Sequence, residues 1–392
     1  MKQRVKPLFG MLLLVVLAVT LSCRVAIRGC LNSFQFQRVN IYDMSEATLN
    51  ETMLRLAAVD LGEVEWKQEI EQLMEGNFVN QGRKNTFLSS GRIATLRDIR
   101  LRSLKGIPVN IQSPLFYPLW LKFRKNLQGW WRNMRFEPDI MSDLVNLVRV
   151  PIDQHNNSGG ENTAKKRYSS CAVVGNSGIL LQSENGELID SHEMVIRLNN
   201  ARTSGYERHV GSKTTLSFIN SNMFHSCAGR DGCVCRTYGA AADVPVVMYI
   251  CQPIHFLDYS ICNSTHGAPP VITDARFDLL CTRLVKFYSL KRFVKQVKKP
   301  LEKWGPGHDV FFHYSSGMQA VMLAVGICDK VSVFGFGKSA LAKHHYHTNQ
   351  KAELGLHDYE AEYDLYHDLI DRPQEIPFIS DKFKFPPVVI YQ

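Results

Sequence analysis

The sequence predicts an α/β fold in which a largely parallel sheet carries helices on both faces, preceded by a membrane anchor and a stem. Three observations predict this arrangement. From residue 168 onward short apolar runs alternate with helical segments, near the N-terminus stands a charge-free apolar run, and a polar, basic stretch lies between them. Strands that alternate with helices form parallel sheets, because the helix between two strands returns the chain to the same end of the sheet.

The anchor is predicted at residues 7–23, PLFGMLLLVVLAVTLSC, which contain no charged side chain. A membrane-spanning helix needs roughly 17–25 apolar residues. The apolar core of a cleaved signal peptide is usually shorter and ends in small residues, and no Ala-x-Ala follows this run. Three basic side chains within residues 1–6 favour a cytoplasmic tail, although two arginines beyond the run weaken the contrast. We expect a single-pass type II anchor, with a cleaved signal peptide as the competing interpretation.

Residues 24–110 are expected to form the stem, and residues 111–392 the lumenal catalytic domain. Apolar residues at helical spacing predict helix over 46–75. The polar, basic residues 76–102 have the composition of a linker.

Two further features are typical of a lumenal body. Glycosylation sequons begin at Asn50, Asn156 and Asn263. Eight of the ten cysteines lie at or beyond residue 171, and in an oxidising lumen we expect most of them to pair. Spacing alone does not determine which cysteines pair.

The body has its own order of elements. The expected strands are 172–174, 194–198, 214–218, 246–250 and 331–336. The expected helices are 140–150, 278–295 and 317–327, and residues 153–166 form a polar loop.

Charge narrows the classes of partner. The formal net charge is +9 for 392 residues, which is mild and gathered in short runs. No basic stripe with interleaved aromatic residues is present, so the sequence argues against nucleic-acid binding. An anionic substrate and an acidic membrane surface explain the charge equally well.

The loop Gly175-Asn176-Ser177-Gly178 follows a predicted strand directly. On its own, such a loop is more often a tight turn than a phosphate site, because glycine tolerates positive φ. It is neither a Walker loop nor a dinucleotide-binding Gly-x-Gly-x-x-Gly. Its position favours a ligand, because ligands of open α/β sheets gather beyond the carboxyl ends of the strands.

The continuation of this loop, residues 171–215, resembles the long motif of the eukaryotic sialyltransferase family, family 29 of the glycosyltransferases. Residues 314–337, YSSGMQAVMLAVGICDKVSVFGFG, resemble the short motif of that family. His345-Tyr346 resembles its next motif, and His357 with Glu362 resembles its His-x4-Glu element. The four motifs stand in the order of the family, and the sequence is most similar to the plant branch, the sialyltransferase-like proteins. One protein of that branch extends type II arabinogalactan with β-1,6-linked galactose.

The resemblance implies a fold and a chemistry. The fold is a Rossmann-like α/β/α sandwich, a variant of the GT-A type, and the reaction is inverting, metal-independent transfer from a nucleotide sugar. His357 is then the general base that takes the proton of the acceptor hydroxyl, a role that suits imidazole with its pKa near 6.5. His345 supports the leaving phosphate as a cation or a hydrogen-bond donor. Glu362 and Tyr346 are supporting residues of these two motifs.

The resemblance also implies a nucleotide site and a disulfide. Asn176 and Asn199 correspond to the asparagines of the family that contact the nucleotide. Ser315, Ser316 and Gly317 correspond to its nucleotide-contacting segment. Cys171 and Cys328 correspond to the two cysteines that join the long and short motifs.

Plainer interpretations stand beside these roles. His357 is also explained as a surface histidine of the helix suggested by HDYEAEYDLYHDL, and the asparagines as turn residues. Ser315 and Ser316 suit a helix N-cap, a role compatible with anion binding. The cluster from His344 to His347 invites a metal interpretation, but adjacent histidines point in different directions, and we expect neither a metal nor another cofactor.

Two departures from the family fall around the expected donor and acceptor site. Tyr314 stands where the short motif usually has proline, and His347-Thr348 follows where an aromatic residue and an acid are common. These departures leave the sugar donor open. The resemblance to the plant branch implies UDP-galactose, with CMP-sialic acid as the alternative. We expect the acceptor to be a glycan on a secreted protein or proteoglycan. We expect the location to be the Golgi membrane, with other Golgi glycosyltransferases as partners. A catalytically silent Golgi scaffold is the interpretation from another class.

Overall fold

The computed structural model describes residues 46–59, 63–76, 117–155, 167–222, 244–262, 270–297, 304, 314–337, 339, 342–348 and 357–391. The predicted anchor and the sequons at Asn156 and Asn263 lie outside these residues, whereas Asn50 lies exposed on a helix. Within the described ranges, no helix has both the length and the apolar character that a membrane crossing requires.

A seven-stranded sheet forms the centre of the body, and every strand pair is parallel. The strand order is β5-β4-β3-β2-β1-β6-β7. The strands are β1 Cys171–Val174, β2 Met194–Leu198, β3 Leu216–Asn220, β4 Val246–Tyr249, β5 Val271–Ile272, β6 Val331–Phe334 and β7 Val388–Tyr391. Strands β2 to β5 are added on one side of β1, and β6 and β7 on the other, so the strand order reverses between β1 and β6. This is the topological switch point at which open α/β sheets bind ligands.

The predicted strands are all present, with small shifts at their ends. The fifth predicted strand, 331–336, ends early at Phe334, because Gly335 has a φ of +76° and leaves the extended conformation. The prediction missed β5 and β7. The signal for β7 was present, since Val-Val-Ile-Tyr is a β-branched and aromatic run.

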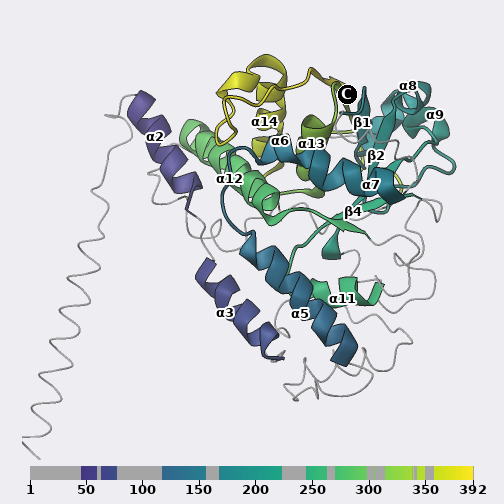
Figure 1. The fold of residues 1–392 in the computed structure, drawn as a ribbon. Coiled ribbons are helices and arrows are strands. Elements are labelled where there is room, and N and C mark those ends of the chain that lie inside the picture. The colour runs from purple at the N-terminus through teal and green to yellow at the C-terminus, as the bar shows by residue number, and fades with distance from the viewer. Residues whose placement is uncertain are drawn as a thin grey trace, which may run out of the picture.

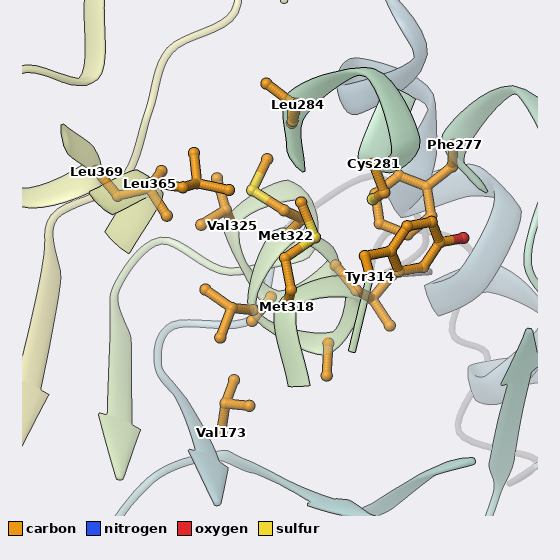
Figure 2. Packing of buried hydrophobic residues seen from close by; sticks show 14 of the residues in the cluster. Val173, Phe277, Cys281, Leu284, Tyr314, Met318, Met322, Val325, Leu365 and Leu369 are labelled. Atoms are coloured by element: carbon orange, nitrogen blue, oxygen red, sulfur yellow. The ribbon is translucent and has the colours of Figure 1, made fainter. Parts of the chain in front are cut away.

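Helix α13, Ser316–Ile327, crosses one face of the sheet and contacts β1, β2, β3 and β6. All twelve of its residues are buried, as expected for a helix that is apolar on every side. Figure 2 shows Met318, Met322 and Val325 of α13 between Val173 of β1 and side chains of two outer helices. Those helices are α12, Ala275–Arg292, and α14, Tyr359–Asp371.

A segment of the predicted stem packs on this outer layer. Helix α2, Glu46–Ala57, lies against α12 and buries Met53 and Ala57 there (Figure 1). The Lys286 side chain of α12 also donates a hydrogen bond to the Val59 carbonyl at 2.9 Å. This part of the stem therefore belongs to the folded body.

The single helix expected over 46–75 is wrong, because the segment forms two helices with separate partners. The second, α3 (Glu63–Met74), packs with α5 (Tyr117–Arg132) and α11 (His255–Cys262) in another apolar cluster near β4 (Figure 1). Gly62 lies between α2 and α3 in the sequence, and glycine costs a helix about 1 kcal/mol relative to alanine.

Short helices complete the two layers. The predicted helix over 140–150 is α6 (Ile140–Leu144), the π-helical turn η3 (Val145–Arg149) and α7 (Val150–His155), so helix extends into the predicted loop 153–166. The opposite face of the sheet is covered by η4 (Gly178–Gln182), α8 (Gly186–Asp190) and α9 (Glu207–Val210). These elements and the sheet enclose a smaller apolar cluster. The remaining turns are η5 (Phe293–Val297) after α12 and η7 (Pro373–Glu375) after α14. The α/β sandwich is thus confirmed.

A disulfide joins Cys171 at the start of β1 to Cys328 at the end of α13, with their Cα atoms 6.0 Å apart. The predicted pairing is confirmed. Cys251 and Cys281, by contrast, carry free thiols, so the expectation that the cysteines mostly pair does not hold for these two.

The disulfide generates a prediction about stability. It closes a loop between cysteines 157 positions apart, and the chain-entropy model gives about 5 kcal/mol for a loop of that length. We expect the variant Cys171→Ala/Cys328→Ala to lose a stability of this order in denaturant unfolding. The control is Cys281→Ala, which truncates a buried free thiol and should cost about 1 kcal/mol. Equal losses in the two variants would contradict the prediction.

Candidate active site

The candidate site lies at the carboxyl ends of β1, β2 and β6, beside the start of α13. Asn176 follows β1, and Asn199 follows β2. Ser315 caps α13, and its hydroxyl accepts the Met318 N–H at 3.1 Å. The first N–H groups of a helix have no partner within the helix and attract anions, so the structure brings the predicted nucleotide-contacting residues to one edge of the sheet.

Two glycines make this convergence possible, because both pack against Phe336. A Cβ atom on Gly317 would lie 2.7 Å from Phe336 Cε1, and one on Gly175 would lie 3.1 Å from Cε2 of the same ring. The Gly175 position would also place a Cβ 2.8 Å from the Gly335 carbonyl oxygen. The β1 loop, the end of β6 and the start of α13 therefore meet around one aromatic ring that larger residues would displace.

The Gly175–Gly178 loop holds the segment that carries His345. The Gly178 N–H donates to the Lys343 carbonyl at 2.9 Å, and the Tyr346 N–H donates to the Asn176 carbonyl at 2.9 Å. A Cβ on Gly178 would lie only 2.6 Å from that Lys343 oxygen. The loop thus serves as the docking surface for the His345-Tyr346 motif, a function that its sequence did not indicate.

Tyr346 is buried and fixes the same segment from its side chain. Its hydroxyl donates to the Arg202 carbonyl, and its ring packs edge-on against Tyr206 with centroids 4.9 Å apart. Burial raises the pKa of Tyr346 to about 12. The hydroxyl therefore stays protonated at neutral pH and serves as an anchor.

The two histidine motifs meet through aromatic contacts. The His345 ring stacks on His344 with centroids 4.6 Å apart, and His344 lies 5.8 Å from the Tyr359 ring. The His357 ring in turn lies 5.5 Å from Tyr359. His345 and His357 therefore belong to one ring cluster, although 11 residues separate them and some of the intervening residues lie outside the described ranges.

The surroundings of His345 favour the neutral imidazole at the pH of the cell. Burial, together with the neighbouring His344 and His347, lowers the pKa of His345 to about 4. Thr348 Oγ1 lies 3.4 Å from His345 Nδ1. The Thr348 hydroxyl carries no charge that would favour the imidazolium form of His345. The His345 side chain is therefore suited to donate a hydrogen bond as a neutral ring.

Glu362 connects the His-x4-Glu element to the short motif. One carboxylate oxygen accepts the Ser315 backbone N–H at 2.7 Å, and the other accepts the Ser315 hydroxyl at 2.6 Å. Burial raises the pKa of Glu362 to about 7, while the hydrogen bonds from Ser315 act in the opposite direction. Glu362 therefore fixes the residue that caps α13.

A polar cluster surrounds Ser316, and part of it was missed by the sequence. Asn199 Nδ2 donates to Ser316 Oγ at 3.3 Å, and Asn220 Nδ2 donates to the same oxygen at 3.0 Å. The Asn220 backbone N–H also donates to Asn199 Oδ1 at 3.1 Å. The available signal was the position of Asn220 at the carboxyl end of β3.

Asn176 retains hydrogen-bonding capacity. Its Nδ2 donates to the Leu198 carbonyl at 3.4 Å. Its Oδ1 is buried and has no hydrogen-bond partner among the residues that the structure describes. Buried polar atoms without partners are rare, so this oxygen is a candidate ligand contact.

Among the residues that the structure describes, no three His, Cys, Asp or Glu side chains form a group that could hold a metal ion.

The class of protein follows from comparison with known families. The model of the family described as glycosyltransferase family 29 (sialyltransferase) matches residues 118–373. The chain therefore belongs to this family and is a glycosyltransferase. The match covers the sheet through β6, α13 and α14, and begins after α2 and α3.

Two plant relatives match this chain along its full length, and two animal sialyltransferases match part of it. It is 50% identical over 404 residues, covering 100% of both chains, to a protein of Arabidopsis thaliana named beta-1,6-galactosyltransferase GALT29A. It is 44% identical over 409 residues, again covering 100% of both, to sialyltransferase-like protein 1 of Oryza sativa subsp. indica. A CMP-N-acetylneuraminate-beta-galactosamide-alpha-2,3-sialyltransferase 1 of Gallus gallus is 27% identical in an alignment of 251 positions that covers 60% of this chain and 66% of that protein. The crystal structure of a mammalian sialyltransferase aligns with a TM-score of 0.38 and 22% identity, covering 68% of this chain and 85% of the other.

The buried Glu362 predicts a pH dependence of stability. Between its ordinary value of 4.5 and about 7, the folded state holds a proton that the unfolded state releases. Stability from this group is therefore complete below pH 4.5 and falls as the pH rises through 7, by about 3 kcal/mol over the interval. Glutamine does not titrate, so the difference in unfolding free energy between wild type and Glu362→Gln should fall from pH 5 to pH 7.5.

Urea unfolding over this pH range measures that difference. The control is Glu360→Gln, an exposed position on the same helix, which should give a flat difference. A flat difference for Glu362→Gln would show that the carboxyl group titrates near its ordinary value.

Proposed function

We propose that this glycosyltransferase transfers galactose from UDP-galactose to type II arabinogalactan in a β-1,6 linkage. The observation that carries the choice of sugar is the similarity, along both full chains, to the Arabidopsis protein named as a beta-1,6-galactosyltransferase. The similarity to the named sialyltransferase is weaker and covers only part of each chain.

The reaction is an inverting displacement at the anomeric carbon. The acceptor hydroxyl oxygen forms a bond to that carbon while the bond from the carbon to the phosphate oxygen breaks, and the bonding electrons leave with the phosphate. His357 takes the hydroxyl proton as general base. Its position immediately before the cap of α14 and in the same ring cluster as His345 supports this role.

In this proposal the nucleoside diphosphate of the donor lies at the edge of the sheet formed by Asn176, Asn199 and the start of α13. The N–H groups of Ser316 and Gly317 are at the positive end of the helix dipole, which favours a negative phosphate. The unpartnered Asn176 Oδ1 provides an acceptor for a ribose hydroxyl. His345 donates a hydrogen bond to the leaving phosphate as a neutral imidazole, and Glu362 and Tyr346 fix Ser315 and the His345 segment.

The cellular setting follows from the predicted topology. We place the enzyme in the Golgi as a single-pass type II protein anchored by residues 7–23, with the catalytic domain in the lumen and the glycan acceptor on a secreted protein. Exposed Asn50 on α2 is compatible with glycosylation at that sequon. Other Golgi glycosyltransferases are candidate neighbours in the membrane, and the proposed reaction uses no metal or other cofactor.

Sialyl transfer from CMP-sialic acid is the second candidate, favoured by the match to a family described by sialyltransferases. A catalytically silent scaffold is less well supported, because the two histidine motifs lie in one cluster and Asn176 retains an unpartnered acceptor.

A donor comparison tests the proposal. We expect the full-length chain, purified in detergent, to transfer galactose from UDP-galactose to a β-1,3-galactan acceptor, and to do so with EDTA present. CMP-sialic acid serves as the competing donor in a parallel assay. Transfer from CMP-sialic acid alone would establish the second candidate, and transfer from neither, with no nucleotide bound, would favour the scaffold.

The roles of the two histidines are tested by substitution. His357→Ala should lower turnover about 100- to 10,000-fold, the usual cost of losing a general base, while nucleotide binding remains near normal. His345→Ala should impair both turnover and nucleotide binding. The control is His367→Ala, an exposed histidine on α14, which should change neither. Near-normal turnover in a folded His357→Ala variant would show that His357 is not the base.

A further inference from the structure

Three polar side chains from three separate segments form a closed cluster beside the proposed nucleotide site. Asn199 follows β2, Asn220 ends β3, and Ser316 begins α13. Asn199 and Asn220 each donate a side-chain N–H to Ser316 Oγ, at 3.3 and 3.0 Å. The Asn220 backbone N–H also donates to Asn199 Oδ1 at 3.1 Å. Each of the three residues is therefore held by the other two.

The hydrogen-bond acceptor capacity of the Ser316 hydroxyl is filled within the protein. A serine hydroxyl offers one donor and two acceptor lone pairs. The two asparagine amides occupy both lone pairs. Ser316 is also 6% exposed. A nucleotide group could donate a hydrogen bond to this oxygen only after one of these internal bonds breaks.

Asn199 needs the support that this cluster provides. Its φ of +48° places it in the left-handed region, which asparagine tolerates better than other residues but at some cost. Its backbone N–H donates to the Phe218 carbonyl at 2.8 Å. Its side chain uses one amide hydrogen on Ser316 and its Oδ1 on Asn220, which leaves the second amide hydrogen for a ligand.

We propose that Asn220 is a positioning residue of the nucleotide site, which holds Asn199 and Ser316 in the arrangement that the nucleotide needs. In this view the Ser316 hydroxyl is the internal centre of the cluster, and the Ser316 backbone and the Asn199 amide face the ligand. The inference rests on the proposed function, because it assumes that a nucleotide binds at this edge. It assigns a role to Asn220 that the motifs do not.

The experiment measures the affinity of the full-length chain in detergent for UDP and for CMP by calorimetry. Asn220→Ala removes the side-chain donor and leaves the backbone N–H, and Asn220→Asp keeps the size but cannot donate from its side chain. Both variants should lower the affinity for the nucleotide that wild type binds by about 10- to 100-fold. The reason is that a lost hydrogen bond and an unsatisfied buried partner together cost about 1–3 kcal/mol. The acceptor KM should change less than twofold.

Asn222 provides the matched controls, because it is exposed and lies two residues further along the chain. Asn222→Ala and Asn222→Asp should bind the nucleotide like wild type. Comparing Asn220→Asp with Asn222→Asp separates a local effect from a general effect of added negative charge. Because Asn220→Ala adds no charge, a loss of affinity in that variant excludes simple repulsion of the phosphate. If Asn220→Ala fails to fold, Asn220→Asp and its control still give the comparison.

A double-variant cycle tests the internal role of Ser316. If its hydroxyl acts through the cluster, Ser316→Ala and Asn220→Ala should each weaken binding, and the double variant should weaken it no further than the stronger single variant. Independent contacts to the nucleotide would instead give multiplying losses, which would overturn the proposal. So would a folded Asn220→Ala variant that binds as tightly as wild type. A wild-type chain that binds neither UDP nor CMP would count against the proposed function itself.

Discussion

The double hydrogen bond between Glu362 and Ser315 is the interaction on which the rest of the site depends. It joins two motifs that lie 47 residues apart, and it fixes the residue that caps α13. Because α13 is buried along its whole length between the sheet and the outer helices, its start cannot shift without disturbing the core. The carboxylate therefore transmits the position of α14, and with it that of His357, to the edge of the sheet where Ser316 and Gly317 begin the helix.

Close backbone packing gives the site its second constraint. Gly175, Gly178 and Gly317 each occupy a position where a Cβ atom would lie within 3 Å of a neighbouring atom. In two cases the neighbour is a backbone carbonyl oxygen, which cannot move aside as a flexible side chain can. The glycines of the β1 loop thus have a docking function: they let the Lys343–Tyr346 segment approach the strand ends closely enough for two backbone hydrogen bonds.

The sequence predicted the core of the fold better than the contacts that connect the residues of the candidate site. The central strands were found because each is a short apolar run buried on both faces, as in 171–174, and the site residues were found through motifs whose order matched a family. The split of 46–75 was missed because helical periodicity does not reveal that α2 and α3 pack against different clusters. Asn220 was missed because its role exists only in contact with a residue 96 positions away.

The departures from the family acquire a physical meaning in the structure. Tyr314 is buried with its ring 5.7 Å from that of Tyr249, which ends β4. The tyrosine that replaces proline therefore joins the residue before the α13 cap to the carboxyl end of β4. Thr348 lies beside His345 Nδ1, where an acid would favour the charged imidazolium. Burial, together with the adjacent His344 and His347, lowers the pKa of His345 to about 4. In the proposed mechanism, support for the leaving phosphate then comes from a neutral N–H together with the start of α13. The placement of that helix would therefore matter more than a fixed positive charge.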